Sequence, residues 1–578
     1  MHHPLGLHII TYFRVATLPI NNPVTNQSPK IDRNANSLVP LTVMQCTPDF
    51  LPLLSQPNVH GDSWISIYPI VSQLIRHFIQ LPQPLLIFNA RCWQAAVAVI
   101  TEASDNNYKL KALQNYDQQR LFGRLNIFKE QEAEFIQGEI YDCNHGSLIL
   151  HISPLLINPN LWFLLKAYLI NHTLPATSAV NGDKLKGEYP IAPLAELDTK
   201  IILVSNRYQL DELAQIDPEY NQVGSLFAEL SSDIQATDEN IHSLQRYCHS
   251  LIKQRGLTEV STEALALLFH HLSSKCEHQK RIVFSPEIIE NLLRYAQLFN
   301  AEQTPLSVDS LQKALDIQVQ SRSLAESFSD QALMEKQLKI QLKGQEIGQI
   351  NGMSVVELMG YPTEFGEIFR ISASDMLGDG EIVDVERKVE LAGNIHAKSI
   401  LIVQGYLNHF FTHIQNFPLS CNVVFEQSYQ ESDGDSASLA IFLAVTSCYS
   451  QLPLSQNLFV TGALDQHGNV LAIGGINQKI KSVTRLFLVG LLNEPVTVLI
   501  PKANQINLTL DVDTLKLISD KKINIYGIDH CHDAFPLAMN RPFENIVKLI
   551  HKRVEDLQKE EREEHESGLL HKLLKLFR

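Results

Sequence analysis

The order in which short apolar runs and helical patterns follow one another most constrains the fold of this chain. From about residue 41 to 250, buried-strand patterns alternate with helical patterns, one of them over residues 161–170. The strand patterns are LLIFNA (85–90), SLILHIS (147–153) and KIILVSN (200–206). Strands that alternate with helices in this way predict an α/β layer with a largely parallel sheet.

Two further changes of pattern divide the rest of the chain. Helical patterns without strands fill residues 251–345, and helices are predicted over 262–272, 285–299 and 307–328. Strand patterns with Gly-rich turns follow, and at 578 residues the chain is too long for one core. We predict a flexible N-terminal extension (1–40), an α/β domain (41–250), a helical domain (251–345), an α+β domain (346–545) and a charged amphipathic tail (546–578).

The chain carries a formal charge of −16, from 47 Lys plus Arg against 63 Asp plus Glu. This balance argues against a specific nucleic-acid partner, because phosphate binding needs basic surface. The sequence contains no apolar run of the roughly 18–20 residues that cross a bilayer. The tail ends in LLHKLLKLFR, which we interpret as a frayed amphipathic helix rather than a membrane contact. Scattered cysteines without a CxxC pair indicate a reducing, cytoplasmic location.

The segment His530-Cys531-His532 has the residue types of a metal site. No second cluster follows at zinc spacing, so we interpret the segment as a surface turn and expect no metal centre.

Small residues surround Ser436 in the segment ESDGDSASLA (431–440), and an apolar helix-forming run follows. The pattern places Ser436 in a tight turn at a helix N-terminus, where the helix dipole favours developing negative charge. A serine or aspartate before a helix is also an ordinary N-cap. This segment alone therefore fits both a helix cap and a nucleophile.

A second segment combines a hairpin with a helix. Residues 459–464 and 470–473 predict two strands around the turn DQHGN (465–469), and Gly474-Gly475 leads into a helix. The helix has an apolar stripe formed by Ile476, Ile480, Val483 and Phe487.

Lys479 falls inside this apolar stripe, whereas Lys481 and Arg485 point the other way. A lysine at such a position either snorkels at the edge of the stripe or is buried. A partly buried lysine is what a Ser–Lys dyad requires, because desolvation lowers the ammonium pKa until the amine can accept a serine proton. Such a dyad needs neither a cofactor nor an Asp–His pair. His467 and His396 lie outside any nucleophile-elbow context, and GxSxG is absent.

Residues 346–540 resemble the proteolytic domain of Lon proteases, and are most similar to the B-type branch in the motif DGDSAS (433–438). The other segments that carry the resemblance are IGQINGMSVVEL (347–358), GEIFRISAS (366–374), GDGEIVDVERKVELAGNIHAKSILIVQGYL (378–407), VTGALDQHGNVLAIGGINQKI (460–480) and VLIPKAN (498–504). The resemblance implies a Lon-type α+β fold and serine endopeptidase activity toward unfolded or loosely folded polypeptides.

The same resemblance implies roles for four residues. Ser436 falls on the nucleophile of the family, and Lys479 falls on its general-base lysine. Thr461 falls on a threonine that positions this lysine. Asp433 matches an acidic residue that can pair with the lysine in inactive B-type conformations. The resemblance also implies a hexameric ring of identical chains.

The N-terminal half resembles the ATPase part of the family only in outline. After LLIFNA a Lon ATPase carries GxxxxGK[ST], whereas this chain has Arg91-Cys92-Trp93-Gln94-Ala95. The strand that would end in carboxylates reads LILHIS, with His151, so neither a Walker A nor a Walker B motif is recognisable. Asn206 could match a sensor asparagine. This half resembles a degenerate AAA+ domain, as in bacterial Lon homologues of the LonH (YcbZ) type, with similarity from about residue 38 to 545.

Three functions are compatible with these features. The first is a Lon-like serine endopeptidase that does not hydrolyse ATP, although the family implies ATP–Mg. The second is a fully ATP-dependent protease with an unrecognised nucleotide site. The third is a catalytically silent scaffold or adaptor, against which the intact Ser436 and Lys479 argue. We expect the first.

Overall fold

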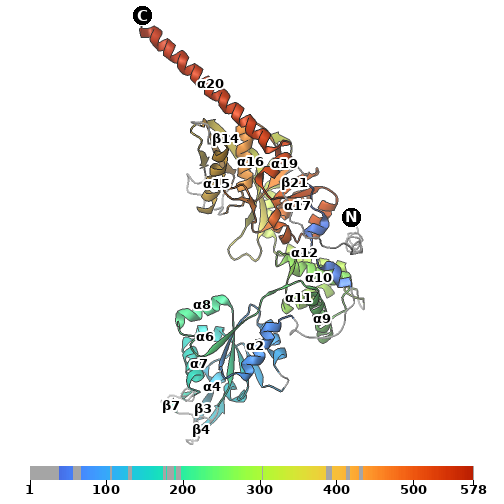
Figure 1. Ribbon diagram of the computed structural model, residues 1–578. Coiled ribbons are helices and arrows are strands. Elements are labelled where there is room, and N and C mark those ends of the chain that lie inside the picture. The colour runs from blue at the N-terminus through green and yellow to red at the C-terminus, as the bar shows by residue number, and fades with distance from the viewer. Residues whose placement is uncertain are drawn as a thin grey trace, which may run out of the picture. The chain divides into compact units, whose positions relative to one another are not determined.

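The computed structural model describes residues 38–55, 67–104, 107–127, 133–172, 177–178, 188–189, 197–301, 304–385, 394–411, 417–427 and 434–576. These residues form two units (Figure 1). Unit 1 contains Phe50–Cys276 and Arg281–Ala314. Unit 2 contains Glu277–Lys280, Leu315–Arg578 and the described residues before Phe50.

A five-stranded parallel sheet forms the centre of unit 1. Its strand order is β2-β5-β8-β1-β9, and every neighbouring pair is parallel. The strands are β1 (Leu85–Asn89), β2 (Leu110–Leu113), β5 (Ser147–His151), β8 (Lys200–Ser205) and β9 (Ser225–Glu229). The three strands expected from apolar runs, β1, β5 and β8, are the central ones and are almost wholly buried. The prediction of an α/β layer with a parallel sheet is confirmed.

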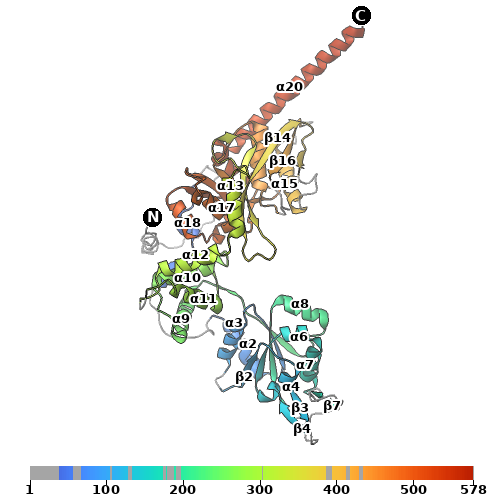
Figure 2. The ribbon, with the colours of Figure 1, turned by 180° about the vertical axis from the view of Figure 1, so that it is seen from behind.

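Helices cover both faces of this sheet, with α2 and α3 on one side and α6 and α7 on the other (Figures 1 and 2). The helices of unit 1 are η2 (Leu51–Ser55), α2 (Pro69–Gln80), α3 (Trp93–Ala103), α4 (Gln118–Phe122), α5 (Glu139–Asp142), α6 (Ser153–Ile157), α7 (Pro159–Asn171), α8 (Arg207–Ile216), α9 (Asp238–Arg255), α10 (Thr262–Ser274), α11 (Pro286–Gln297) and the first part of α12 (Val308–Gln320). Three two-stranded ladders pair β3 (Gly123–Ile127) with β4 (Ala133–Gln137), β6 (Thr177–Ser178) with β7 (Glu188–Tyr189), and β10 (Asp233–Gln235) with β11 (Arg281–Val283).

The helices expected over 161–170, 262–272 and 285–299 correspond to α7, α10 and α11. The side chain of Ser285 accepts a hydrogen bond from the N–H of Ile288, so it caps α11 at its N-terminus. The single helix expected over 307–328 is wrong. The chain turns at Ser321–Arg322 and begins a new helix, α13 (Leu324–Met334), which belongs to unit 2.

A seven-stranded mixed sheet, ordered β15-β16-β14-β13-β18-β21-β22, forms the centre of unit 2. Its strands are β13 (Gln349–Val356), β14 (Phe365–Leu377), β15 (Ile382–Asp384), β16 (Leu419–Glu426), β18 (Leu458–Val460), β21 (Val496–Pro501) and β22 (Ile523–Ile528). β14 pairs antiparallel with β13 and β16, whereas β13, β18, β21 and β22 pair in parallel. Short ladders join β12 (Gln345–Glu346) to β17 (Leu454–Ser455) and β19 (Ala463–Leu464) to β20 (Val470–Leu471). The last ladder confirms the hairpin expected around residues 465–469.

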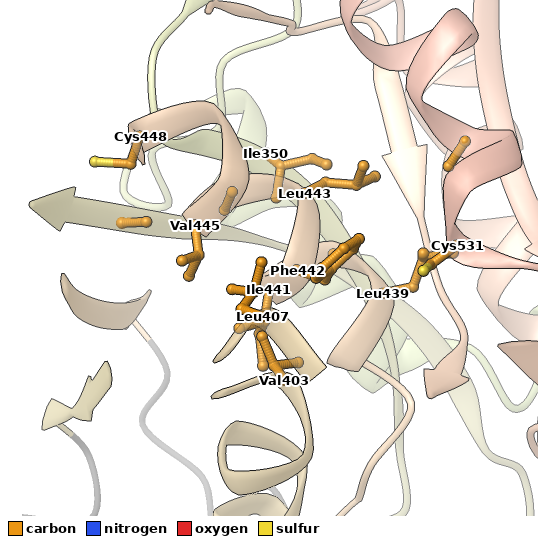
Figure 3. Packing of buried hydrophobic residues seen from close by; sticks show 14 of the residues in the cluster. Ile350, Val403, Leu407, Leu439, Ile441, Phe442, Leu443, Val445, Cys448 and Cys531 are labelled. Carbon is orange, nitrogen blue, oxygen red and sulfur yellow. The ribbon is translucent and has the colours of Figure 1, made fainter. Parts of the chain in front are cut away.

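Helix α16 (Ser438–Ser450) is buried along its whole length. Figure 3 shows Ile441, Phe442 and Val445 of this helix packed among apolar side chains that include Val403 and Leu407. The latter two belong to α15 (Asn394–Phe411). The other helices of unit 2 are η1 (Val43–Cys46), α13, α17 (Ile476–Leu488), η4 (Lys502–Asn507), α18 (Val512–Ser519), η5 (Cys531–Ala534), α19 (Phe535–Met539) and α20 (Phe543–Leu576).

Helix α17 lies unusually close to the β13–β14 hairpin, and two glycines make this possible. Gly475 begins the helix with φ +62°, and a Cβ there would lie 2.4 Å from Cγ2 of Val355. A Cβ on Gly366 of β14 would lie 2.0 Å from the carbonyl oxygen of Gln478. A side chain at Gly366 would require the backbone to move, and one at Gly475 would strain the left-handed backbone and displace the Val355 side chain, so the start of α17 lies directly against the sheet.

The first part of helix α20 packs against the core. Ile546, Ile550 and Val554 are buried among the residues around α16, so the segment assigned to a tail from residue 546 begins inside this domain. Further on, the helix extends beyond the rest of unit 2 (Figure 1). Among the described residues, none of the helices is both long and apolar enough to cross a membrane.

Candidate active site

Ser436 lies in the turn that precedes α16, as the small-residue pattern predicts. The carbonyl oxygen of Asp435 accepts hydrogen bonds from both the N–H (3.1 Å) and the hydroxyl of Ser438, which closes the turn around Ser436. Ser436 is partly exposed, whereas the helix that follows is buried. Its hydroxyl therefore stands at the positive end of a helix that is shielded from water, where negative charge is favoured.

Lys479 is buried, with 4% of its surface exposed, so it does not snorkel at the edge of the apolar stripe. Its helix, α17, starts at Ile476. The backbone N–H of Lys479 donates to the carbonyl oxygen of Gly475 over 3.0 Å. Because Gly475 and Gly366 hold this first turn against β13 and β14, the lysine side chain leaves the helix from a fixed backbone.

The amine of Lys479 is 3.0 Å from the hydroxyl of Ser436, a hydrogen-bond distance. Burial lowers the pKa of the Lys479 ammonium to about 8, and the nearby carboxylate of Asp435 opposes this shift. Relative to an ordinary lysine at pKa 10.5, this raises the neutral fraction near pH 7 by roughly 300-fold. Two segments that are distant in sequence thus bring a hydroxyl and a partly neutral amine together in a partly buried site.

Thr461 contacts the backbone of the serine. Its hydroxyl donates to the carbonyl oxygen of Ser436 over 3.2 Å, and the N–H of Gly462 donates to the same oxygen over 2.7 Å. The N–H of Leu439 in turn donates to the carbonyl oxygen of Gly462 over 3.0 Å. The strand end after β18 therefore holds the backbone of the turn that carries Ser436.

The remaining candidates separate clearly from this pair. Asp433 lies outside the described residues. The carboxylate of Asp435, two residues further on, is the acidic group whose charge raises the pKa of Lys479. His467 lies in the β19–β20 turn, where its N–H donates to the carboxylate of Asp465 over 2.8 Å. The hydrogen bonds of Asp465 to His467 and Asn469 explain the turn as a structural motif.

The interpretation of residues 530–532 as a surface turn is wrong for its central residue, because Cys531 is fully buried. The ligand atoms of His530, Cys531 and His532 lie within 4.8 Å of one another. However, Nδ1 of His530 accepts the N–H of His532 (3.2 Å), and its Nε2 is 3.0 Å from the carbonyl oxygen of His467, to which it must donate. Both nitrogens of His530 are therefore engaged, and we assign the segment a packing role.

The carboxyl edge of the parallel sheet in unit 1 is where a nucleotide would bind in a domain of this kind. Strand β1 ends at Asn89 and α3 begins at Trp93, and the N–H of Ala90 between them donates to the carbonyl oxygen of Ser205 over 2.7 Å. The connection is therefore short and is tied to the neighbouring strand. It offers neither a glycine nor a lysine to hold phosphates.

The side chains at this edge also do not fit a magnesium-bound triphosphate. The rings of Trp93 and His151 meet edge to face with centroids 5.5 Å apart, and burial lowers the pKa of His151. At the end of β9 the carboxylate of Glu229 accepts a hydrogen bond of 2.6 Å from the Asn89 side chain. Asn206, the possible sensor residue, accepts the N–H of Gln209 and so caps α8.

A serine hydroxyl at a buried helix N-terminus, with a lysine amine within hydrogen-bond distance, is characteristic of a serine-type peptidase. Residues 330–540 match the family model of the Lon protease (S16) C-terminal proteolytic domain, and residues 106–231 match that of a LonB-like AAA domain. The second match begins after α3. The β1–α3 connection, where a phosphate loop would lie, is therefore not part of the matched region.

Two curated relatives cover most of the chain. It is 31% identical over 460 residues to a putative Lon protease homolog of Escherichia coli (77% of this chain, 76% of that protein). It is 32% identical over 459 residues to the Haemophilus influenzae protein of the same description (77% and 75%). An archaeal Lon protease of Methanocaldococcus jannaschii is 39% identical over 102 residues, or 18% of this chain and 14% of that protein. The chain belongs to the Lon protease family and is a serine-type peptidase.

Proposed function

We propose that this protein is an endopeptidase in which Ser436 is the nucleophile and Lys479 is the general base, acting on unfolded or loosely folded polypeptides. The observation that carries the proposal is the hydrogen bond of 3.0 Å between the Lys479 amine and the Ser436 hydroxyl. The burial that lowers the lysine pKa supports the role of base, since the amine is neutral in a useful fraction of molecules near neutral pH.

The proposed reaction follows from this geometry. The Lys479 amine takes the Ser436 proton as the oxygen attacks the carbonyl carbon of the substrate. The negative charge that develops on the carbonyl oxygen is stabilised at the N-terminus of α16. The Lys479 ammonium then gives its proton to the leaving amine, and an ester on Ser436 remains. A water molecule, deprotonated by Lys479, hydrolyses the ester and restores both groups.

The proposal is tested with fluorescent casein and a fluorophosphonate probe. The wild-type chain should degrade casein and become labelled on Ser436, whereas Ser436→Ala should do neither while keeping its unfolding temperature. Removing a serine nucleophile costs roughly 10⁴–10⁶ in rate. Retention of more than about a tenth of the wild-type turnover would contradict the assignment.

We also propose that peptide hydrolysis is independent of ATP. The short β1–α3 connection and the Trp93–His151 contact support this, since phosphoryl transfer depends on positioned phosphates and metal. Unit 1 then serves as a platform or a substrate-gathering surface, and cleavage is limited to chains that are already unfolded. This limits the substrates to polypeptides that need no active unfolding.

A hexameric ring in the cytoplasm is the assembly and location that we propose. The match to the Lon proteolytic domain supports the assembly, and the scattered cysteines support the location. Light scattering of the purified chain at micromolar concentration should report a mass about six times that of the 65.2 kDa chain. A monomer alone would contradict the ring.

A further inference from the structure

Arg485 is a buried cation on the helix that carries Lys479. Its side chain is 8% exposed, and its Nε donates to Oδ1 of Asp330 over 2.9 Å. Its Nη1 is 2.5 Å from Oε1 of Glu326. A buried arginine is costly unless its donors are paired, and here two carboxylates pair with it.

Both carboxylates come from one helix, α13. Glu326 and Asp330 are spaced i and i+4, so their side chains lie on the same face and together receive the planar guanidinium. Burial raises the pKa of the Asp330 carboxyl group. The charges of Arg485 and Lys481 oppose this upward shift, and the charge of Glu326 adds to it. The start of α13 is also fixed, because the Tyr361 hydroxyl donates to the carbonyl oxygen of Arg322 over 2.9 Å.

The third contact of Arg485 leads back to the lysine. Its Nη2 donates over 2.9 Å to the carbonyl oxygen of Gly366. At Gly366 of β14, α17 approaches so closely that a Cβ would lie 2.0 Å from the Gln478 carbonyl oxygen and 3.0 Å from the backbone nitrogen of Lys479. One guanidinium therefore joins α13, β14 and α17 next to the backbone from which Lys479 projects.

Helix α13 is also the first helix after the last point at which the chain passes from unit 1 to unit 2. The helix before it, α12, starts in unit 1 and ends in unit 2, since the division falls between Ala314 and Leu315. The two acidic residues that hold Arg485 thus lie on the helix that follows the last passage of the chain from unit 1 to unit 2.

We infer that Arg485 is a positioning residue for Lys479, and that Glu326 and Asp330 anchor it, so that α13 sets the geometry of the Ser436–Lys479 pair. The inference rests on the proposed function. Arg485 acts through the backbone of α17 and β14, and it has no role in proton transfer.

Removing the guanidinium should loosen the first turns of α17 and let water reach Lys479. A more solvated ammonium has a higher pKa, since desolvation is the main cause of its lowered value, while the carboxylate of Asp435 already favours the charged form. The loss should therefore appear as a lower kcat near neutral pH and as partial recovery at higher pH.

The test compares Arg485→Met with wild type in the full chain. Turnover of a short fluorogenic peptide should fall about 10–100-fold in kcat with little change in KM, as a misplaced catalytic group predicts. The pKa of Lys479, measured by the pH dependence of its labelling with acetic anhydride and mass spectrometry, should rise by about one unit. This labelling does not require turnover.

A matched control is Arg553→Met, which removes another ion-paired arginine of unit 2, one that is partly buried. Arg553 ion-pairs with Asp375 and donates to the carbonyl oxygens of Cys448 and Tyr449, at the end of α16 remote from Ser436. It should leave the labelling pKa of Lys479 unchanged. Equal labelling curves for wild type, Arg485→Met and Arg553→Met would overturn the inference.

A second variant, Glu326→Gln with Asp330→Asn, keeps Arg485 and removes its anchors. It should shift the Lys479 labelling curve in the same direction. If Arg485→Met and this double variant both fail to unfold cooperatively, the cluster only holds the fold and the inference is wrong. Failure of the proposed function is distinguishable, because wild type would then equal Ser436→Ala in turnover while the labelling shift still reports on Arg485.

Discussion

The hydroxyl of Thr461 and the N–H of Gly462 both donate to the carbonyl oxygen of Ser436, over 3.2 and 2.7 Å. A carbonyl oxygen with two donors is fixed more firmly than one with a single donor, because neither lone pair is left to water. The orientation of the Ser436 hydroxyl toward Lys479 therefore depends on the strand end at 461–462 as well as on the helix that follows.

Thr461→Val should lower kcat about 10-fold without unfolding the domain. Valine has nearly the same shape, and the Gly462 donor still satisfies the carbonyl oxygen, so a single hydrogen bond of about 1 kcal/mol is lost. Peptide turnover and the rate of fluorophosphonate labelling would measure the effect. The control is Thr446→Val, which removes a buried hydroxyl bonded within α16 to the Phe442 oxygen. Equal losses in both variants would refute a specific role for Thr461.

Lys479→Arg should be as inactive as Lys479→Ala. Arginine keeps the charge, but its guanidinium does not lose a proton at any working pH and cannot accept one from Ser436. Hydrolysis of casein and of a short peptide would both be measured. Near-normal activity of the arginine variant would show that the base lies elsewhere and that Lys479 is structural.

The rate of peptide hydrolysis should rise with pH through one ionisation near pH 8 and then level off. The sign follows because the neutral amine is the active form, and it becomes the main form above the pKa of about 8. The quantity to measure is kcat/KM between pH 6 and 10, with the unfolding temperature at each pH as control. A midpoint close to 10.5, the value of an ordinary lysine, would rule out a desolvated base.

Lys479→Met should abolish activity and stabilise the fold at pH 7. Burial lowers the folded pKa to about 8, below that of the unfolded chain, so the folded state binds fewer protons between these values. Stability therefore increases as pH rises from about 8 to 10.5, and below that window the wild type carries the full penalty of roughly 3 kcal/mol.

Methionine removes this penalty but also a hydrogen bond, so we expect a net gain of about 1–3 kcal/mol at pH 7 that shrinks toward pH 10. Thermal unfolding of both proteins across this range provides the measurement, at about 2–4 °C per kcal/mol for a domain of this size. A variant less stable than wild type at pH 7 would show that Lys479 is not held against a desolvation cost.

ATP turnover should stay below about 0.1 per second, with or without casein, against roughly 1–100 per second for phosphoryl-transfer kinases. The reason is that the β1–α3 connection and the end of β5 offer no glycine, lysine or carboxylate to hold the phosphates and the metal. A faster reaction that is lost in Glu229→Gln, the carboxylate at the same edge, would instead support the ATP-dependent alternative.

The buried elements of the fold were predictable from the sequence, and the half-exposed ones were not. Strands β1, β5 and β8 are short apolar runs and stand in the middle of their sheet. The edge strands β2 and β9 have mostly partly exposed side chains, such as Lys111 and Glu229, and so lack an apolar pattern. The break between α12 and α13 has no proline or glycine to mark it, so helical spacing continues across it.

At the candidate site, Ser436 and Lys479 were predictable because a small-residue turn and a lysine in an apolar stripe are local signals. Arg485 was not, since its position off the stripe suggests solvent, whereas α13 covers it. The apolar pattern of a single helix predicts which face packs on the sheet, but it does not predict which element covers the opposite face. For the same reason, the contact of Thr461 with the serine backbone depends on a pairing between distant segments.

The first part of α20 has a practical consequence for anyone who shortens this protein. Three side chains of this helix belong to the apolar core around α16, namely those of Ile546, Ile550 and Val554. Arg553 caps the C-terminal end of α16. A fragment that stops at residue 545 would expose the apolar core around α16 to water and should aggregate. A fragment that stops just after Leu557 keeps these core side chains and removes the charged residues that follow. Leu557 is therefore a suitable C-terminal boundary for crystallisation trials.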